Sequence, residues 1–405
     1  MKLELKRQDF LKAWQTAEKI AVSKAIPDIV NSIRIKADFD GQVTLEATDL
    51  KTSVKCKAQG VAVIEPGRAM LPVVILGGML KKLKCDTLTI EVNGTKGMLF
   101  AEGNKTRFTV VPVENFPNIP ESSGAEMKCE IQSSSLAAVI AEGSTASSQP
   151  QDFPKYIGAC LMSIDDEKLK VASTDGKRLA ISESLCTVHM KEEILLPLQA
   201  FRELSKQLAS CNDENVRIIA DDSTVWFALD EVEFSIRRID ANFPDYHRIL
   251  NSNIETELHI SCDELISVIE RVDIVAKTTI PHIMVIDMNP NGRLRVYARA
   301  PEGVAGEFLE ADITGSPMQI GFNAGYFLDG LRALGSGDIK IEFSGSEEQT
   351  RMKRNDSSNF LYMLMPSRLS SQDILDDELN DADSYSDNNP EEHYDMPEPE
   401  GEQDF

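Results

Sequence analysis

The stretch LPVVILGGMLKKLK, residues 71–84, decides the fold of this chain, because its order of signals returns twice further along. An apolar residue and a Pro open an amphipathic helix here and in LPLQAFRELSKQLA (196–209), and a Gly takes the place of the Pro in IGFNAGYFLDGLRAL (320–334). The three stretches begin at residues 71, 196 and 320, so the period is about 125 residues. A repeat at a constant period predicts one structural unit used three times.

The segments around these helices repeat in the same order. Each helix is followed by an apolar strand, and each unit closes at a proline; the strands are LTIEV (88–92), VRIIA (216–220) and IKIEF (339–343), and the closing pairs are Phe116-Pro117, Phe243-Pro244 and Met365-Pro366. Another helix opens each unit, at residues 7–20, 133–143 and 261–276, and Ser261 is suited to cap the third. Turn dipeptides that supply positive φ join period-2 runs into antiparallel hairpins: Asp40-Gly41, Asn93-Gly94 and Asn291-Gly292.

These signals predict an α+β fold with three repeated domains, each made of two helices packed on antiparallel sheets of about eight strands. The expected boundaries are 1–123, 124–252 and 253–372, followed by an acidic segment at 373–405. Two such chains that meet head to tail can close a ring of six domains, because heterologous contacts close when the rotation permits it.

Composition bounds the class of protein. Fourteen of the 66 acidic residues and none of the 42 basic ones lie in 373–405, which leaves −10 of the formal charge of −24 on residues 1–372. Residues 373–405 cannot bury enough apolar surface to fold alone, so we expect disorder there. The seven cysteines are scattered without a CxxC pair, which favours reduced core thiols over metal binding, and no apolar run is long enough to cross a bilayer. We expect a cytoplasmic protein without cofactor or membrane contact.

Four further motifs are STDGKRLAIS (173–182), NFPDYHRIL (242–250), IGFNAGYFLDGL (320–331) and MLMPSRL (363–369). In this order and spacing they resemble the beta subunit of bacterial DNA polymerase III over residues 1–369. The resemblance implies a DNA clamp fold and a non-catalytic processivity factor, a head-to-tail homodimer whose inner helices surround double-stranded DNA without reading its sequence. It also implies partners: the DNA polymerase III alpha subunit, the clamp loader complex, and other polymerases and repair proteins that carry clamp-binding motifs.

Basic residues recur on one helix of each unit, at Lys81, Lys82 and Lys84, at Arg202 and Lys206, and at Arg332. They form either solvated helix faces or a surface that meets phosphates without gripping bases. The resemblance implies DNA contact by Lys24, Lys81, Lys82, Gln151, Tyr156 and Lys206. Leu198-Gln199 depart from the family, which often has two basic residues there, so the attraction for DNA is expected to be weaker.

The resemblance also implies an apolar pocket between the second and third units that binds short linear motifs. The matching residues are Ile157, Thr174, Gly176, Arg178, Leu179, Pro244, Arg248, Ile249, Ile280, Asn323, Tyr326, Met363, Met365 and Pro366. From the residues alone, 173–182 is also explained by a turn at Asp175-Gly176 and 242–250 by a domain-closing loop. Lys177, Ile280 and Ser367 differ from the usual residues of the family, which predicts a different motif preference. At the dimer interface, Phe108 and Val110 are expected to face Ile274 and Val275.

Other functions remain open. No HExxH, GxxxxGK, GxSxG or Cys/His cluster supports an enzyme, and the pairs Asp165-Asp166 and Asp221-Asp222, which could hold magnesium, fall where hairpin turns are expected. A repeat scaffold that binds proteins without DNA would fit the net charge. Three roles remain open for the acidic segment. It is a solubilising extension, a ligand that folds back onto the pocket through residues 372–375 or 403–405, or a charged segment that repels DNA from the outer surface.

Overall fold

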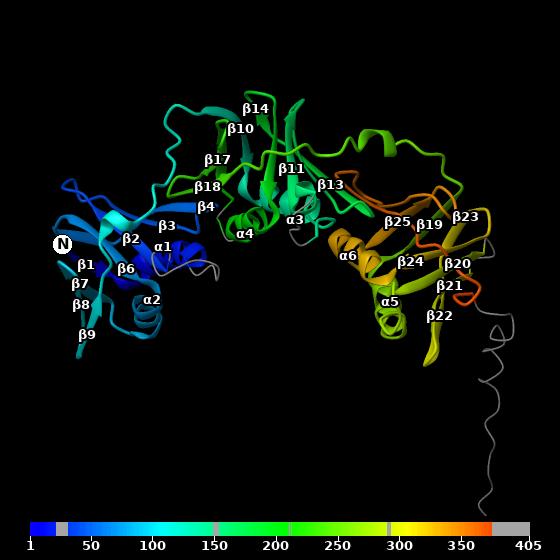
Figure 1. The fold of residues 1–405 in the computed structure, drawn as a ribbon, viewed down its shortest axis with the longest axis horizontal. Coiled ribbons are helices and arrows are strands. Elements are labelled where there is room, and N and C mark those ends of the chain that lie inside the picture. Colours follow the sequence, from blue (N-terminus) through cyan, green and yellow to red (C-terminus); the bar gives the residue numbers. More distant parts are fainter. Residues whose placement is uncertain (22–30, 149–153, 210, 212, 290–292, 375–405) are drawn as a thin grey trace, which may run out of the picture.

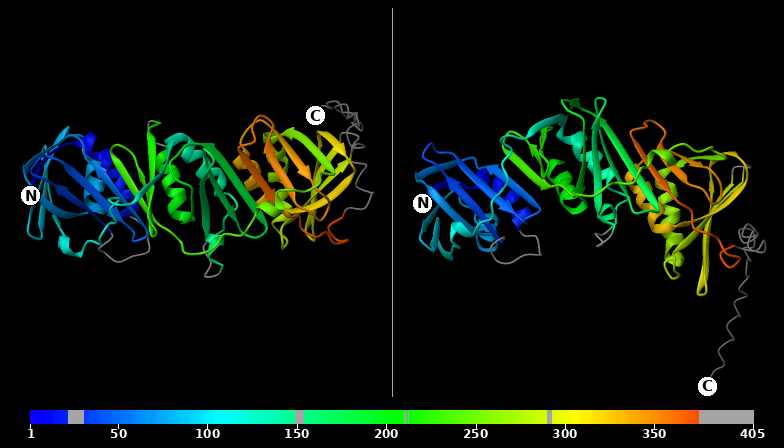
Figure 2. Two further views of the ribbon diagram at one scale, coloured as in Figure 1. Left: turned by 90° about the horizontal axis from the view of Figure 1, so that it is seen from above. Right: turned by 45° about the horizontal axis from the view of Figure 1, so that its top comes forward.

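The computed structural model describes residues 1–21, 31–148, 154–209, 211, 213–289 and 293–374. Three units follow one another along an arc, with the helices on its concave side and the sheets around them (Figure 1). The beginning and the end of the described chain lie at opposite ends of this arc (Figure 2). The described residues contain no helix that is both long and apolar enough to cross a membrane.

The first unit has two helices, α1 and α2, and strands β1 to β9. Their bounds are β1 (Lys2–Lys6), α1 (Arg7–Ala21), β2 (Ser32–Ala37), β3 (Val43–Thr48), β4 (Thr52–Lys57), β5 (Val61–Glu65), β6 (Gly67–Pro72), α2 (Val73–Lys82), β7 (Thr87–Asn93), β8 (Lys96–Ala101) and β9 (Asn104–Thr109), followed by the 3-10 turn η1 (Val113–Asn115).

The second unit repeats this order with α3, α4 and strands β10 to β18. Their bounds are β10 (Glu126–Gln132), α3 (Ser133–Gly143), η2 (Lys155–Gly158), β11 (Ala159–Asp165), β12 (Lys168–Thr174), β13 (Arg178–Leu185), β14 (Thr187–Val188), β15 (Glu192–Pro197), α4 (Leu198–Leu208), β16 (Asn215–Ala220), β17 (Thr224–Ala228), β18 (Val232–Arg237) and η3 (His247–Ile249).

The third unit has α5, α6 and strands β19 to β27. Their bounds are β19 (Thr256–Ser261), α5 (Cys262–Ala276), β20 (Ile283–Asn289), β21 (Arg293–Ala300), β22 (Gly303–Glu310), β23 (Asp312–Gly315), β24 (Met318–Asn323), α6 (Ala324–Leu334), β25 (Asp338–Phe343), β26 (Thr350–Arg354) and β27 (Phe360–Leu364). Within the described residues each unit therefore has nine strands, one more than expected, because a short edge strand such as β14 carries little periodicity.

The helices form where the sequence predicts them. In α1 the side chains of Phe10, Trp14 and Ala17 recur at helical spacing and are fully buried. Ser261 caps α5 as predicted, since its side chain accepts a hydrogen bond from the Glu264 amide, and Asn323 caps α6 in the same way through the Tyr326 amide. These caps fix the helix starts at the ends of β19 and β24.

The hairpin turns also agree with the sequence where the structure describes them. Gly41 and Gly94 have φ of 85° and 57°, the left-handed region that Gly enters without steric cost. The third predicted turn, Asn291-Gly292, lies outside the described residues.

Among the residues that the structure describes, all paired strands are antiparallel, and two of the four sheets cross from one unit to the next. One nine-stranded sheet has the order β14-β10-β16-β17-β18-β4-β3-β2-β6 and joins the second unit to the first through β18 and β4. The other has the order β15-β11-β12-β13-β27-β26-β25-β19-β23 and joins the second unit to the third through β13 and β27. The units are thus fused by main-chain hydrogen bonds.

A smaller sheet remains at each end of the arc. The five-stranded sheet β5-β1-β7-β8-β9 belongs to the first unit, and the four-stranded sheet β22-β21-β20-β24 belongs to the third; we call the latter the C-terminal sheet. In each shared sheet, five strands of one unit meet four strands of its neighbour. The two end sheets therefore have the same strand numbers, five and four, as the two halves of a shared sheet. Their edge strands β9 and β22 occupy the positions that the joining strands occupy in the shared sheets.

Candidate functional site

The concave face carries the basic residues that the sequence singled out, several of them in ion pairs. Lys81 on α2 contacts Glu18 of α1 at 2.7 Å, Lys206 on α4 lies 3.8 Å from Glu203, and both lysine side chains are exposed. Lys82 is exposed beside Lys81 at the end of α2. These long cationic side chains can exchange a carboxylate for a phosphate at small cost, because exposed ion pairs are weak.

Two other cations of this face hold the helices together. Arg202 donates to the side chain and carbonyl of Ser144 at 3.1 and 2.6 Å, and Arg332 contacts Glu270 at 2.6 Å. Tyr156 packs edge-on against Phe243 with ring centres 6.3 Å apart. Its ring is therefore turned toward the linker to the third unit, residues 238–246 between β18 and η3. Lys24 and Gln151 lie outside the described residues.

An apolar pocket of about 240 Å³ opens where β13 pairs with β27, between the second and third units. Its lining includes seven residues of the predicted set, Thr174, Gly176, Arg178, Leu179, Ile249, Met363 and Met365. Leu179 and Met363 are buried at its base, whereas Ile249 and Met365 remain 45% exposed. A hollow with a buried apolar base and exposed apolar walls suits one large apolar side chain of a ligand.

A turn shapes this pocket, as the simpler interpretation of residues 173–182 predicts. The Asp175 carboxylate accepts hydrogen bonds from the amides of Lys177 and Arg178, and Gly176 adopts φ of 86°. The turn and the pocket are therefore one structure. Sequence reasoning did not include Gln349 and Leu364 in the lining. Gln349 donates to the Ile249 carbonyl at 3.2 Å, a contact across 100 positions that no local pattern signals.

Arg178 connects the pocket to a second hollow on the third unit. Its guanidinium contacts Asp175 at 2.9 Å and Asp329 at 2.7 Å, and its Cζ lies 4.2 Å from the centre of the Tyr326 ring. Burial opposes the charge of Arg178, but Tyr362 and Asp329 more than offset it, so the pKa of Arg178 is raised above its ordinary value. The charge is therefore fixed in place at every physiological pH.

The second hollow, of about 790 Å³, is lined by Ile280, Asn323 and Tyr326 of the predicted set, together with Asp329 and other residues of α5 and α6. The Ile280 side chain is 94% exposed, which is unusual for an isoleucine. Ten of the fourteen predicted pocket residues thus line two neighbouring hollows. Arg178 lines the first hollow and contacts Tyr326 and Asp329 of the second.

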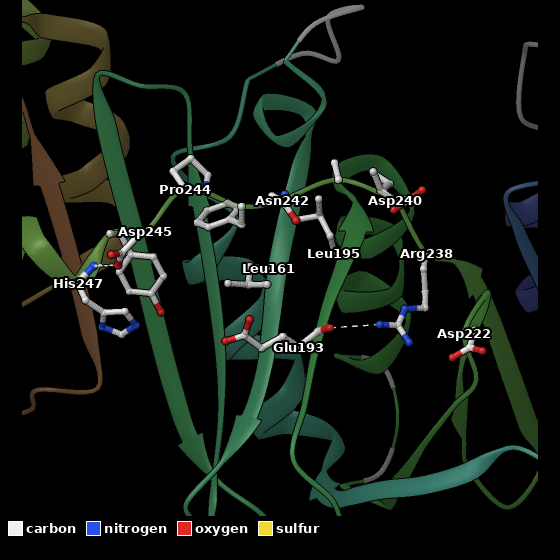
Figure 3. Close-up of a pocket in the computed structure, with 14 residues that line it drawn as sticks. Leu161, Glu193, Leu195, Asp222, Arg238, Asp240, Asn242, Pro244, Asp245 and His247 are labelled. Atoms are coloured by element: carbon white, nitrogen blue, oxygen red, sulfur yellow. Dashed lines mark hydrogen bonds between the residues drawn. The ribbon is translucent and has the colours of Figure 1, made fainter.

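The remaining predicted pocket residues lie elsewhere on this surface. Pro244 lines a third hollow of about 710 Å³ beneath the linker from β18 to η3. Figure 3 shows the linker passing over the strands that carry Leu161 and Leu195. Arg248 is 88% exposed at the side chain and lies 3.3 Å from Asp245, and Ile157 accepts a hydrogen bond from Ser147 through its carbonyl. Pro366 is half-buried after β27.

The hollow beneath the linker was not expected from the sequence. Glu193, Asp222 and Asp245 give it an acidic lining, and Arg238 bridges it by donating to the Glu193 carbonyl at 3.2 Å (Figure 3). Burial raises the pKa of Tyr246, whose ring stacks on His247 with ring centres 4.5 Å apart. Its polar lining separates it chemically from the apolar pocket.

The residues predicted at the dimer interface lie at the two ends of the arc. Phe108 and Val110 are buried in the first unit, at 4% and 5% exposure, where the Phe108 ring fills the space left by Gly97. Ile274, near the end of α5, is 70% exposed, while Val275 is partly covered. Sequence reasoning missed two exposed apolar residues on β22, Val304 and Phe308.

The carboxylate pairs form turns, as predicted. Asp165 and Asp166 both pair with Lys191, and Asp166 itself has φ of 46°. The Asp221 carboxylate accepts from the amides of Ser223 and Thr224. Across the described part of the chain, no group of three His, Cys, Asp or Glu side chains is placed to hold a metal ion.

Comparisons with known proteins agree along the chain. Three models of one family match in order: DNA polymerase III beta subunit, N-terminal domain at 1–120, central domain at 130–245 and C-terminal domain at 247–368. The beta sliding clamp of Vibrio cholerae is 26% identical over 373 residues, which cover 91% of this chain and all of that protein. That of Escherichia coli is 24% identical over 372 residues with the same coverage. The crystal structure of the DNA polymerase III subunit beta from Pseudomonas aeruginosa superposes with a TM-score of 0.85 at 24% identity, covering 91% of this chain and all of that one.

Proposed function

Because the chain belongs to the DNA polymerase III beta subunit family, we propose that two copies of it close into a ring around duplex DNA and hold a polymerase there. The subunit is a sliding clamp and does no chemistry of its own. Its contribution is topological, since a closed ring leaves DNA only when it opens or reaches an end. We also propose that it works in the cytoplasm.

The proposed ring rests on the numbers of strands in the sheets at the two ends of the arc, which match the two halves of the sheets shared inside the chain. Each joint inside the chain pairs five strands of one unit with four of the next, through β18 and β4 or through β27 and β13. The end sheets offer five and four strands, with β9 and β22 in the corresponding edge positions. An edge strand with free amides and carbonyls takes up another strand readily. We therefore propose that β9 of one copy pairs with β22 of the other, twice per ring.

Exposed apolar side chains next to β22 support this joint. Val304 and Phe308 lie on β22, and Ile274 lies on α5, which packs against it. Arg271 of α5 also makes a two-pronged contact with Glu307 of β22 at 2.5 and 2.6 Å, which holds helix and edge strand together. Phe108 and Val110 are proposed to stabilise β9 from inside, rather than to reach across the joint themselves.

The inner surface is proposed to meet the phosphate backbone through Lys81, Lys82 and Lys206, and through Lys24, Gln151 and Tyr156. Exposed lysines on helices attract DNA without reading bases, which permits sliding. The acidic partners of Lys81 and Lys206, Glu18 and Glu203, support a weak contact. The ring, rather than affinity, then keeps the protein on DNA.

The apolar pocket and the hollow beside it are proposed to bind short linear motifs of partner proteins. The expected partners are the DNA polymerase III alpha subunit, the clamp loader complex, and other polymerases and repair proteins. One large apolar side chain fits the 240 Å³ pocket, and a second can lie along Tyr326 and Ile280. Arg178 fixes the spacing between the two, because it contacts both units.

The experiment that tests the ring compares retention on closed circular and linearised DNA after loading by a matching clamp loader with ATP. We expect retention on the circle and loss from the free ends of linear DNA. Equal retention on both would mean ordinary DNA binding, and retention on neither, with an active loader, would favour a scaffold that binds only proteins.

The pocket is tested by substituting Ile249→Ser, which removes one exposed apolar wall and should weaken binding of a motif peptide about tenfold. The control Ile64→Ser changes an isoleucine of similar exposure, 52%, on β5 of the first unit. Equal effects of the two substitutions would contradict the proposed pocket.

A further inference from the structure

The last residues of the part that the relatives share and the first residues beyond it cross the C-terminal sheet. The Ser367 amide donates to the Gly321 carbonyl of β24 at 2.8 Å, and Leu369 lies against Gly321 so closely that a Cβ there would sit 2.5 Å from it. Further on, Arg299 of β21 donates to the Ile374 carbonyl at 3.1 Å. Since β20 lies between β24 and β21, residues 367–374 span the sheet.

This crossing takes place on the face of the sheet that points away from the helices. Leu294, Val296 and Ala298 of β21 belong to the core that includes α5, and strand residues alternate between faces. Tyr297 therefore belongs to the opposite face, yet it is only 1% exposed. The Arg295 guanidinium covers part of its ring, with Cζ 5.1 Å from the ring centre. Within the crossing segment, residues 370–373 form a turn in which the Ser370 amide and hydroxyl donate to the Asp373 carboxylate at 2.8 and 2.6 Å.

Three arginines lie in a row on the same face of β21, and we call Arg293, Arg295 and Arg299 the arginine strip. The guanidinium groups of Arg293 and Arg295 lie 5.2 and 5.3 Å from the centre of the Phe308 ring, within the range of a cation–π contact. In the strand register, Arg295 stands opposite Asp287, and Arg293 stands opposite Glu310. Arg293 and Arg299 are exposed on this face and Arg295 is partly exposed, so a ligand can reach the guanidinium groups of the strip.

We propose that the arginine strip is a binding surface for acidic peptide and that its occupant is residues 375–405 of the same chain. These residues contain thirteen Asp and Glu and no Lys or Arg. Ile374, the residue before them, is already bound to Arg299. Guanidinium groups bind carboxylates through paired, charge-assisted hydrogen bonds, so the acidic segment supplies the chemistry that the strip selects.

The lengths agree with this assignment. A flexible segment of 31 residues has a typical end-to-end distance of roughly 30 Å, and the strip, from residue 293 to residue 299, extends over roughly 20 Å. A ligand tethered at the edge of its own site acts at a local concentration of order millimolar. Weak individual ion pairs then suffice for occupancy at low salt, and salt is expected to release the segment.

The position of the strip gives the contact a consequence that rests on the proposed ring. The strip is adjacent to β22, the edge strand of the proposed joint, and on the face turned away from the helices that are proposed to meet DNA. Bound there, the thirteen carboxylates are held away from the DNA path. The part of residues 372–375 that the structure describes contacts Arg299 and lines none of the three hollows described above, which argues against the motif pocket as its site.

The experiment uses a fluorescent synthetic peptide of residues 375–405 and measures its anisotropy with two forms of the protein, the full chain and a chain that ends at Ile374. The shorter form retains everything that the relatives match. We expect the shorter chain to bind the peptide at low salt and the full chain to bind it at least tenfold more weakly, because its own segment occupies the strip. Equal affinity for the two forms would overturn the proposal.

Substitutions in the shorter chain locate the site. The pair Arg295→Gln and Arg299→Gln should lower peptide affinity on the order of tenfold, whereas Arg217→Gln, an exposed arginine of β16, should not change it. Loss caused instead by Ile249→Ser or by Lys81→Gln would place the peptide in the motif pocket or on the inner helices and would overturn the assignment. Neither measurement requires DNA or a loader. The proposed peptide contact can therefore be wrong while the proposed ring is correct, and the ring can be wrong while the contact is correct.

Discussion

The Arg178 guanidinium lies 4.2 Å from the centre of the Tyr326 ring, so a side chain at the start of β13 in the second unit is seated on α6 of the third. The same guanidinium contacts Asp329 at 2.7 Å and lies on the lining of the apolar pocket. A single charged residue therefore connects the shape of the pocket to the packing of two units. A buried charge that is held on several sides is costly to remove.

Replacing this arginine should weaken both the fold and the pocket. We expect Arg178→Gln to lower the free energy of unfolding by about 1–3 kcal/mol, because charge-assisted hydrogen bonds to Asp175 and Asp329 are lost. Urea unfolding measures the change. Arg248→Gln is the control, since Arg248 is 88% exposed at the side chain and should shift stability by less than about 0.5 kcal/mol. Similar losses for both variants would contradict the role given to Arg178.

The proposed joint predicts a weakened dimer when its exposed apolar surface is charged. Ile274→Asp should raise the dimer dissociation constant roughly tenfold to a hundredfold, because a carboxylate would be buried without a partner. The stability of the separate subunit should change little, since Ile274 is 70% exposed. Sedimentation equilibrium measures the constant. Phe39→Asp alters a side chain that is 96% exposed in the turn after β2, and an equal effect there would mean that Ile274 is outside the joint.

The cysteines should divide into two classes of reactivity. Burial raises the pKa of the Cys56 and Cys160 thiols to about 12 and that of Cys262 to about 11, so almost no thiolate forms at pH 8. We expect these three thiols to resist a thiol reagent until the protein unfolds. Cys85, which is partly exposed, should react in the native state, and Cys211 should react more slowly because burial raises the pKa of its thiol. Mass spectrometry after labelling identifies the sites, and rapid native labelling of Cys56 or Cys160 would contradict the described core.

Glu342 should make stability depend on acid pH. Burial opposes its charge, but Lys353 at 2.9 Å and Lys340 at 3.2 Å more than offset this, so the pKa of Glu342 lies below its ordinary 4.5. A depressed carboxyl pKa contributes stability above the unfolded-state pKa, and the contribution is lost as pH falls through the lower folded-state value.

We therefore expect Glu342→Gln to lower the free energy of unfolding by about 1–3 kcal/mol at pH 7 and to differ less from the natural chain near pH 3. The comparison is made by denaturant unfolding at both pH values, with the exposed Glu347→Gln as control. A difference that is unchanged at pH 3 would show that the charge of Glu342 is not responsible.

Much of the architecture could be predicted from local patterns. The three helix openings, the strands after them and the capping Ser261 depend on residues a few positions apart, and all were found where expected. In the second unit the count of strands was low because β14 has only two residues and no periodicity of its own. The site was predicted less completely. Residues such as Gln349 enter the pocket through pairing across the chain, which leaves no local trace.

By itself the sequence determined that one unit is used three times, that helices and antiparallel hairpins alternate within it, and that the negative charge is concentrated after residue 372. These properties follow from side-chain periodicity and turn chemistry, which act over a few residues. Only the tertiary structure decided that sheets cross between units, that the predicted pocket residues divide among separate hollows around Arg178, and that residues 367–374 lead onto the arginine strip. Strand edges and surfaces find their partners through shape and hydrogen bonding over long sequence separations, which no local pattern encodes.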